Sequence, residues 1–169
     1  MKNINIHIEP REILYDVMNK THIAGDLFAK KSKNEEIASL IQASDDADII
    51  YQLNRSITSA INTVYITLNE IIDEHYDKSV NLINQSVESG NTLVIPIKLT
   101  SNYDDSCIDS ISGLIHDYAV CRSVAEWYVI TNKEDANIYV TFANDAITNL
   151  QKVMYKRVRP SGNFKIKKQ

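Results

Sequence analysis

The sequence has few of the residues that interrupt regular structure. It contains four glycines and three prolines among 169 residues, and this scarcity favours long helices and strands over loops. No apolar run reaches the length of about 18 residues that a membrane-spanning helix requires. The start, Met-Lys-Asn-Ile-Asn-Ile-His-Ile, lacks the continuous apolar core of a signal peptide. We therefore expect one domain of long regular elements with no membrane partner.

Cysteine is also scarce, and the spacing of the two cysteines excludes a disulfide within one helix. Cys107 and Cys121 both fall in a segment that we predict to be helical, residues 104–131. Their separation in a helix is roughly 21 Å, whereas a disulfide requires Cα atoms within about 7 Å. Two free thiols are typical of a protein from the reducing cytosol.

Signatures of catalysis are missing as well. The sequence has no glycine-rich phosphate loop, no His-Glu-x-x-His helix and no Gly-x-Ser-x-Gly turn. His75 lies among acidic residues, but none of them is three or four positions away, so none shares its helical face. His116 and Asp117 are adjacent and therefore point in different directions. We expect no enzyme, no metal and no cofactor; a small enzyme that uses His75 or His116 is the least favoured alternative.

Acidic residues are missing from the C-terminal end, where the last one is Asp145. Seven of the 18 Lys and Arg residues follow it, so residues 1–145 carry 11 basic groups against 22 acidic ones. This acidic body argues against a dedicated nucleic-acid binder. The basic end alone keeps nucleic-acid binding open as an alternative.

Apolar periodicity predicts a mainly α-helical bundle with one long central helix, a β-hairpin insertion and an extended basic C-terminal tail. Residues 1–158 form the expected single domain, in which 1–9 are an extended arm and 79–99 the hairpin. Helices are expected from Pro10 to about Gly25, from an Asn34 N-cap, over 46–76, over 104–131 and from 132 to about 158. The helix over 46–76 would be the longest, at about 45 Å.

Residues 79–99 break the helical pattern. Val80 and Leu82 are the candidate partner strand for a second strand that contains Pro96. Because Pro96 cannot donate to a ladder, we expect the second strand to be an edge strand or to leave that position unpaired. An isolated hairpin is marginal in water, so we expect it to contact the helices or a neighbouring subunit. The hairpin interface would consist of the alternating residues Leu93, Ile95, Ile97 and Leu99.

The C-terminal segment 159–169 alternates apolar and basic residues. Asn-Phe-Lys-Ile-Lys at 163–167 is typical of a strand that adds to the sheet edge of another protein. A solvated basic tail is the alternative interpretation. The residues predicted to bind the partner are Arg157, Arg159, Pro160, Phe164, Lys165, Ile166, Lys167 and Lys168.

Helices, a strand pair before the last two helices and a basic C-terminal extension together resemble the head–tail connector proteins (adaptors or neck rings) of tailed bacteriophages. The segment Ile115-His-Asp-Tyr-Ala-Val-Cys-Arg-Ser-Val-Ala-Glu-Trp-Tyr128, with Ala136 to Pro160 after it, is similar to proteins of phages and prophages of Bacteroides-type hosts, including crAss-like phages. The resemblance covers most of residues 35–160 and is one of pattern and composition.

This resemblance implies a structural role. Such adaptors form rings of twelve copies beneath the portal protein, contact adjacent neck or capsid proteins and extend the channel through which double-stranded DNA passes. Residues 158–169 would then match the extension that binds the portal. The expected location is the virion neck at the portal vertex, after assembly in the host cytoplasm. The alternative is a cytosolic helical binding module whose basic tail contacts nucleic acid or an acidic partner.

Overall fold

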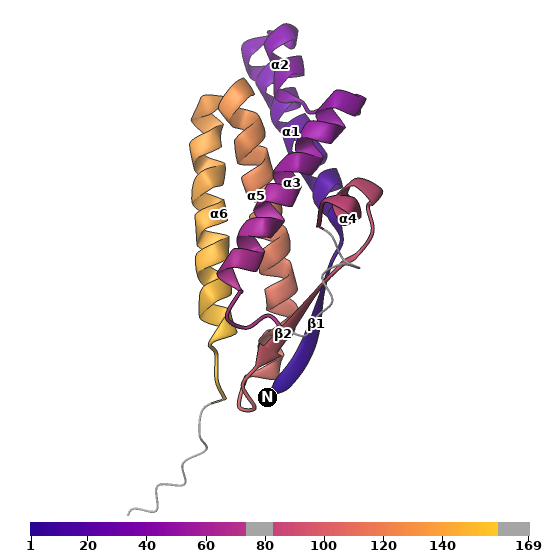
Figure 1. Ribbon diagram of the computed structural model, residues 1–169. Helices are drawn as coiled ribbons and strands as arrows, with labels where there is room; N and C mark the ends of the chain where they lie inside the picture. Colours follow the sequence, from indigo (N-terminus) through magenta and orange to yellow (C-terminus); the bar gives the residue numbers. More distant parts are fainter. Residues whose placement is uncertain (74–82, 159–169) are drawn as a thin grey trace, which may run out of the picture.

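The computed structural model describes residues 1–73 and 83–158, and in this part the protein is an elongated helical bundle with one pair of strands (Figure 1). The mainly α-helical fold class is thereby confirmed. His75, Val80, Leu82 and the tail from Arg159 onward lie outside the described residues. The elements in chain order are β1 (Lys2–Ile8), α1 (Pro10–Ser32), α2 (Glu35–Ile41), α3 (Ala47–Thr67), α4 (Ile83–Ser89), β2 (Leu93–Leu99), the 3₁₀ helix η2 (Asp105–Cys107), α5 (Ile108–Thr131) and α6 (Lys133–Met154).

The central helix is α5, which is 24 residues long. Most of its middle is buried, as in Tyr118, Val120, Val124 and Tyr128, because α6 packs along one flank while α3 and α1 pack along others (Figure 1). A helix that is apolar all round is one that other elements surround. The centre of the bundle is thus the second-last helix of the chain.

The helix predicted over 46–76 is shorter than expected. It ends at Thr67, and the N–H of the capping residue Leu68 donates back to the Val64 carbonyl at 2.9 Å. Ile71 and Ile72 fit the helical periodicity, but they extend along β2 instead: Ile72 bridges to Ile97, and the Ile71 carbonyl accepts from Lys98 N at 2.6 Å. At Ile71 and Ile72, pairing with β2 is therefore favoured over continuation of the helix, although the apolar repeat fits a helix.

The first helix is longer than expected, because Gly25 does not end it. Gly25 is a buried position inside α1 at the crossing with α2, where a Cβ atom would lie 2.8 Å from the Ala38 carbonyl oxygen. The predicted N-cap of α2 is confirmed: the Asn34 side chain accepts from Ile37 N at 3.2 Å. In the sequence alone, a glycine that lets two helices pack closely looks the same as a glycine that ends a helix.

The strand at 93–99 is confirmed, but its partner is the N-terminal arm. β1 and β2 are antiparallel, with a register that runs from Lys2 opposite Leu99 to Ile8 opposite Leu93. Residues 83–89, which the predicted hairpin included, form α4. The alternating residues Ile4, Ile6 and Ile8 therefore belong to the strand that pairs with β2, about 90 residues away along the chain.

Candidate functional site

The four side chains predicted as a hairpin interface lie in the core of their own chain. Leu93 and Ile95 are 0% exposed, and Ile97 and Leu99 at most 2%. Because they pack with the isoleucines of β1 against the helices, no apolar face of β2 remains for another subunit. The expectation of an interface at these residues is corrected accordingly.

The C-terminal end of the described chain is bound to the loop before α5. Arg157 bridges to Tyr103, and Val158 N donates to the Asn102 carbonyl at 3.0 Å. The Arg157 guanidinium donates to the Lys156 carbonyl at 3.2 Å, so this predicted partner-binding residue also has a local role. The other predicted tail residues, from Arg159 to Lys168, are outside the described part.

Burial makes Tyr103 an unusual residue at this exit point. Its side chain is 1% exposed, and burial, followed by the charges of Cys107 and Asp104, raises the pKa of its hydroxyl to about 12. That hydroxyl has no hydrogen-bond partner in the described residues. The neutral, unpaired phenol anchors the chain where the tail begins, and nothing about it indicates a reactive group.

One histidine has an acidic partner that sequence reasoning missed. His116 Nε2 on α5 lies 2.9 Å from Asp16 Oδ2 on α1, in a shallow pocket of about 410 Å³ that Arg11, Glu12 and Tyr15 also line. Sequence reasoning considered only the adjacent Asp117 and rejected it, whereas the partner in the structure is 100 residues away. Only the packing of α1 on α5 reveals it.

The chemistry available at this His–Asp pair is limited. A general base requires a nucleophile within hydrogen-bond reach. Ser112, one helical turn before His116, donates its hydroxyl to the His7 carbonyl at 3.1 Å instead. The pair thus joins two helices and does not activate that serine.

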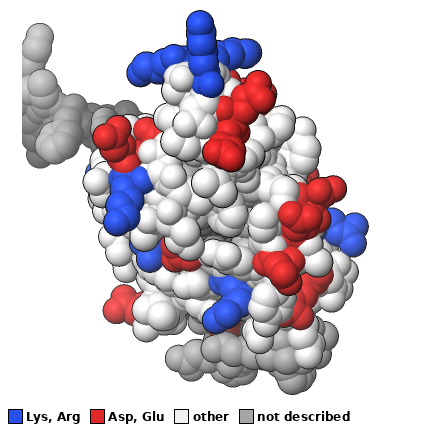
Figure 2. Space-filling model, turned by 90° about the horizontal axis from the view of Figure 1, so that it is seen from above, with Lys and Arg blue, Asp and Glu red and all other residues white. Residues whose placement is uncertain are grey.

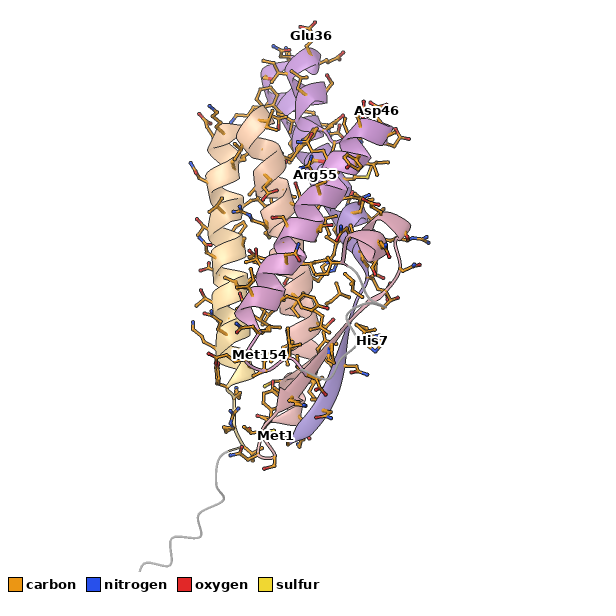
Figure 3. All side chains as sticks on the ribbon, in the orientation of Figure 1. Met1, His7, Glu36, Asp46, Arg55 and Met154 are labelled. Atoms are coloured by element: carbon orange, nitrogen blue, oxygen red, sulfur yellow. The ribbon has the colours of Figure 1, made fainter. Side chains whose placement is uncertain are left out.

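A polar groove follows the exposed side of α3. Two adjoining pockets of about 460 and 570 Å³ are lined by Tyr51, Arg55 and Ser59, and Figure 3 places Arg55 midway along this helix. Arg122 and Glu126 of α5 form an ion pair at 3.1 Å beside it. Both pockets are open and mostly polar, so they suit water or a contacting surface better than an enclosed ligand.

The described part of the chain shows neither a metal-binding cluster nor a membrane-spanning helix. No group of three or more His, Cys, Asp or Glu residues there is arranged to hold a metal ion. Cys107 and Cys121 are free thiols, and burial raises the pKa of the Cys121 thiol. No helix in residues 1–73 and 83–158 is both long and apolar enough to cross a bilayer.

Several helices expose large apolar side chains, and on α1 and α6 two of these side chains are four residues apart. On α1 these are Ile23 (50% exposed) and Leu27 (61%), named here the α1 ridge. On α6 they are Ile138 (50%) and Phe142 (52%), named the α6 ridge. Figure 2, which views the end of the molecule that carries α2, shows scattered acidic and basic groups with broad uncharged areas between them. Sequence periodicity identified the buried stripes of these helices and left the ridges unmarked.

Comparison with known proteins yields no relative. Neither protein-family models nor curated proteins nor solved structures match this chain.

Proposed function

We propose that this protein is a structural component of a phage portal–neck ring, which joins the capsid to the tail and extends the DNA channel. Support comes from the resemblance of residues 115–128 and 136–160 to connector proteins, together with a helical bundle in which α6 packs along the central helix α5. The observation that carries the proposal is the presence of exposed apolar ridges on two different helices, α1 and α6.

Two unlike ridges suit a ring. A closed ring of identical copies uses a heterologous contact, in which one surface of a copy meets a different surface of the next. Ile23 and Leu27 on α1 and Ile138 and Phe142 on α6 provide such a non-identical pair. In this proposal the α6 ridge of one copy packs near the α1 ridge of its neighbour, and the portal organises the copies into a twelve-membered ring.

The charge distribution suits a channel wall. With 11 basic groups against 22 acidic ones in residues 1–145, the body repels passing DNA and does not retain it. The basic residues after Asp145 are left for contacts with the portal or a neighbouring copy. This division of charge is the reason to favour a structural ring over a helical module that binds nucleic acid with its tail.

The test is light scattering of the purified protein with and without the portal protein of the same phage. We expect ring-sized complexes in the presence of the portal, and electron microscopy should show them on its axis. Phe142→Asp should prevent ring formation, because it places a charge in the proposed apolar contact. Asn144→Asp adds the same charge at a nearby exposed position and should leave the ring intact. Both variants should retain the helical circular dichroism spectrum.

A protein that stays monomeric and ignores the portal would contradict the proposal. Tight DNA binding that weakens steeply with salt and disappears when residues 159–169 are deleted would instead support the nucleic-acid-binding module.

A further inference from the structure

Pro96 shows which residues of β2 direct their main-chain N–H and carbonyl groups toward β1 and which direct them away from it. It lies opposite Asn5 of β1 and has no N–H to donate. Its carbonyl accepts from Asp73 N at 3.0 Å, and Lys98 N donates to the Ile71 carbonyl at 2.6 Å. The N–H and carbonyl of one residue share a side in an antiparallel pair. The main-chain polar groups of Pro96 and Lys98 therefore point away from β1.

It follows that the main-chain N–H and carbonyl groups of Asn3, Asn5 and His7 in β1 point away from β2. The His7 carbonyl accepts from Ser112 Oγ at 3.1 Å. The N–H and carbonyl of Asn3 and Asn5, and the N–H of His7, have no partner within residues 1–73 and 83–158. All three residues are exposed, and in Figure 3 His7 projects from the side of the molecule. β1 thus has one free edge.

The first turns of α5 and the 3₁₀ helix before it line this edge. Lys2 Nζ at the start of β1 lies 2.6 Å from Asp105, and Ser112 contacts His7 further along. Asp109, one helical turn after Asp105, is exposed. The edge is therefore accessible at the exposed residues Asn3 and Asn5, and the neighbouring helical segment begins with the acidic residues Asp105 and Asp109.

A free strand edge is a ready acceptor for another strand, and the chemistry of the C-terminal segment suits this one. Residues 1–158 hold 14 basic and 22 acidic groups, whereas residues 159–169 hold four basic groups and no acidic group. The alternation Phe164, Lys165, Ile166, Lys167 puts apolar side chains on one face of a strand and basic ones on the other. Ile4, which is only partly buried on the inner face of β1, would gain an apolar neighbour.

The reach and the level of the segment favour a second copy as its source. Eleven residues follow Val158 and span up to about 35 Å when extended. Val158 is bound to Asn102 and Lys2 to Asp105, so the chain leaves the body at the end where β1 begins (Figure 1). Copies related by a ring axis keep the same level along it. The segment of one copy therefore starts at the level where β1 of the next copy begins, and its extended length allows it to cross to that strand.

We propose that residues 163–167 of one copy add as a strand to the free edge of β1 in the neighbouring copy. Phe164 and Ile166 would share the inner face with Ile4, and Lys165 would share the outer face with Asn5. The side-by-side placement of copies rests on the proposed ring, whereas the acceptor edge itself does not.

Disulfide cross-linking between two differently tagged full-length chains tests this inference. One chain carries Asn5→Cys and the other Lys165→Cys, both in a Cys107→Ser, Cys121→Ala background whose fold is checked by circular dichroism. Neighbouring strands are about 4.8 Å apart, within the range that a disulfide allows. We expect a cross-linked heterodimer under mild oxidation. The control replaces Asn5→Cys by Glu36→Cys, at the opposite end of the molecule (Figure 3), and should give at least about tenfold less product, since positions more than about 7 Å apart cannot bridge.

A backbone variant supplies a second readout. Asn5→Pro removes an outward N–H and leaves the ladder to β2 intact, because Asn5 donates nothing to β2. With His7→Cys in one chain and, in the other, Asn163→Cys or Lys167→Cys (the positions opposite His7 in an antiparallel or a parallel pair), Asn5→Pro should lower the rate of cross-linking by about tenfold, the effect of one hydrogen bond and a steric block. Asn5→Thr keeps the N–H and should leave the rate unchanged.

Each result decides between the two proposals. Rings on the portal without the cross-link would overturn the edge inference and leave the proposed function standing. The cross-link without rings would support the edge inference and count against the proposed function. A single chain that carries both cysteines and closes only on itself, or a segment that cross-links only to the portal, would overturn the inference that a neighbouring copy is the acceptor.

Discussion

Replacing Gly25 by alanine should destabilise the protein even though alanine is the better helix former. Gly25 lies inside α1, and the exchange alone would favour the helix by about 1 kcal/mol. The new methyl group, however, would lie 2.8 Å from the Ala38 carbonyl oxygen and would also overlap the Gln42 side chain. The carbonyl belongs to the backbone of α2, so the two helices must move apart.

The expected size follows from these opposing effects. Overpacking typically costs about 1–3 kcal/mol. Displacing Gln42 also weakens its hydrogen bonds to Asp26 at 2.8 Å and to the His22 carbonyl at 3.2 Å, each worth about 0.5 kcal/mol at an exposed site. After subtraction of the helix-propensity gain, Gly25→Ala should lower the free energy of unfolding by about 1–2 kcal/mol.

Gly113 provides the matched control. It lies within α5, is exposed, and has nothing within 4 Å of where a Cβ atom would stand. Gly113→Ala should therefore stabilise the protein by up to about 1 kcal/mol. The same chemical change is thus expected to have opposite signs at two positions of one molecule.

Urea unfolding followed by tryptophan fluorescence measures both variants. The single tryptophan, Trp127, donates its indole N–H to the Ile41 carbonyl at 2.8 Å, so its emission reports the docking of α2. If Gly25→Ala is as stable as the parent protein, or more stable, the close approach of α1 and α2 is refuted.

Three further predictions concern the buried aromatic residues. Trp127→Phe should lower the free energy of unfolding by about 1–3 kcal/mol in urea titrations, because it leaves the Ile41 carbonyl without its donor. Tyr128→Phe should be neutral or stabilising in the same titrations, since its buried hydroxyl has no partner in the described residues. Stability should fall as the pH rises from 10 to 12, because the unfolded chain releases the Tyr103 proton near its ordinary pKa of 10.0 and the folded chain near about 12. Tyr103→Phe should flatten this fall in unfolding midpoints measured across that range; an unchanged slope would contradict the assigned pKa.

Local signals predicted the elements whose ends depend on their own residues. Asn34 has a side chain that caps α2, and the interpretation that rested on it held. The segment around Ile111, Ile115 and Tyr118 is apolar enough to be central, and it ends at Thr131 as predicted. In these places the sequence and the fold are linked by interactions within a few residues.

Signals that depend on distant partners were misinterpreted. Ile71 and Ile72 continue the helical repeat of α3, but hydrogen bonds of the β2 edge draw them out of it. Gly25 resembles a helix stop and is instead a packing position against Ala38. The His116–Asp16 pair joins residues 100 positions apart. No local pattern encodes such contacts, because they exist only after α1, α2 and β2 have packed.

The pairing of β1 with β2 changes which strand offers a free edge to the C-terminal tail. In a hairpin at 79–99, Pro96 would have indicated that β2 is an edge strand. In the structure both sides of β2 are occupied, by β1 and by residues 71–73, and the free edge has moved to the N-terminal strand. A basic, alternating segment at the other terminus leaves the body at the same end of the molecule. A strand with one free edge and a segment with the pattern of a strand therefore occur in one chain, and side-by-side copies would bring them together without any further protein.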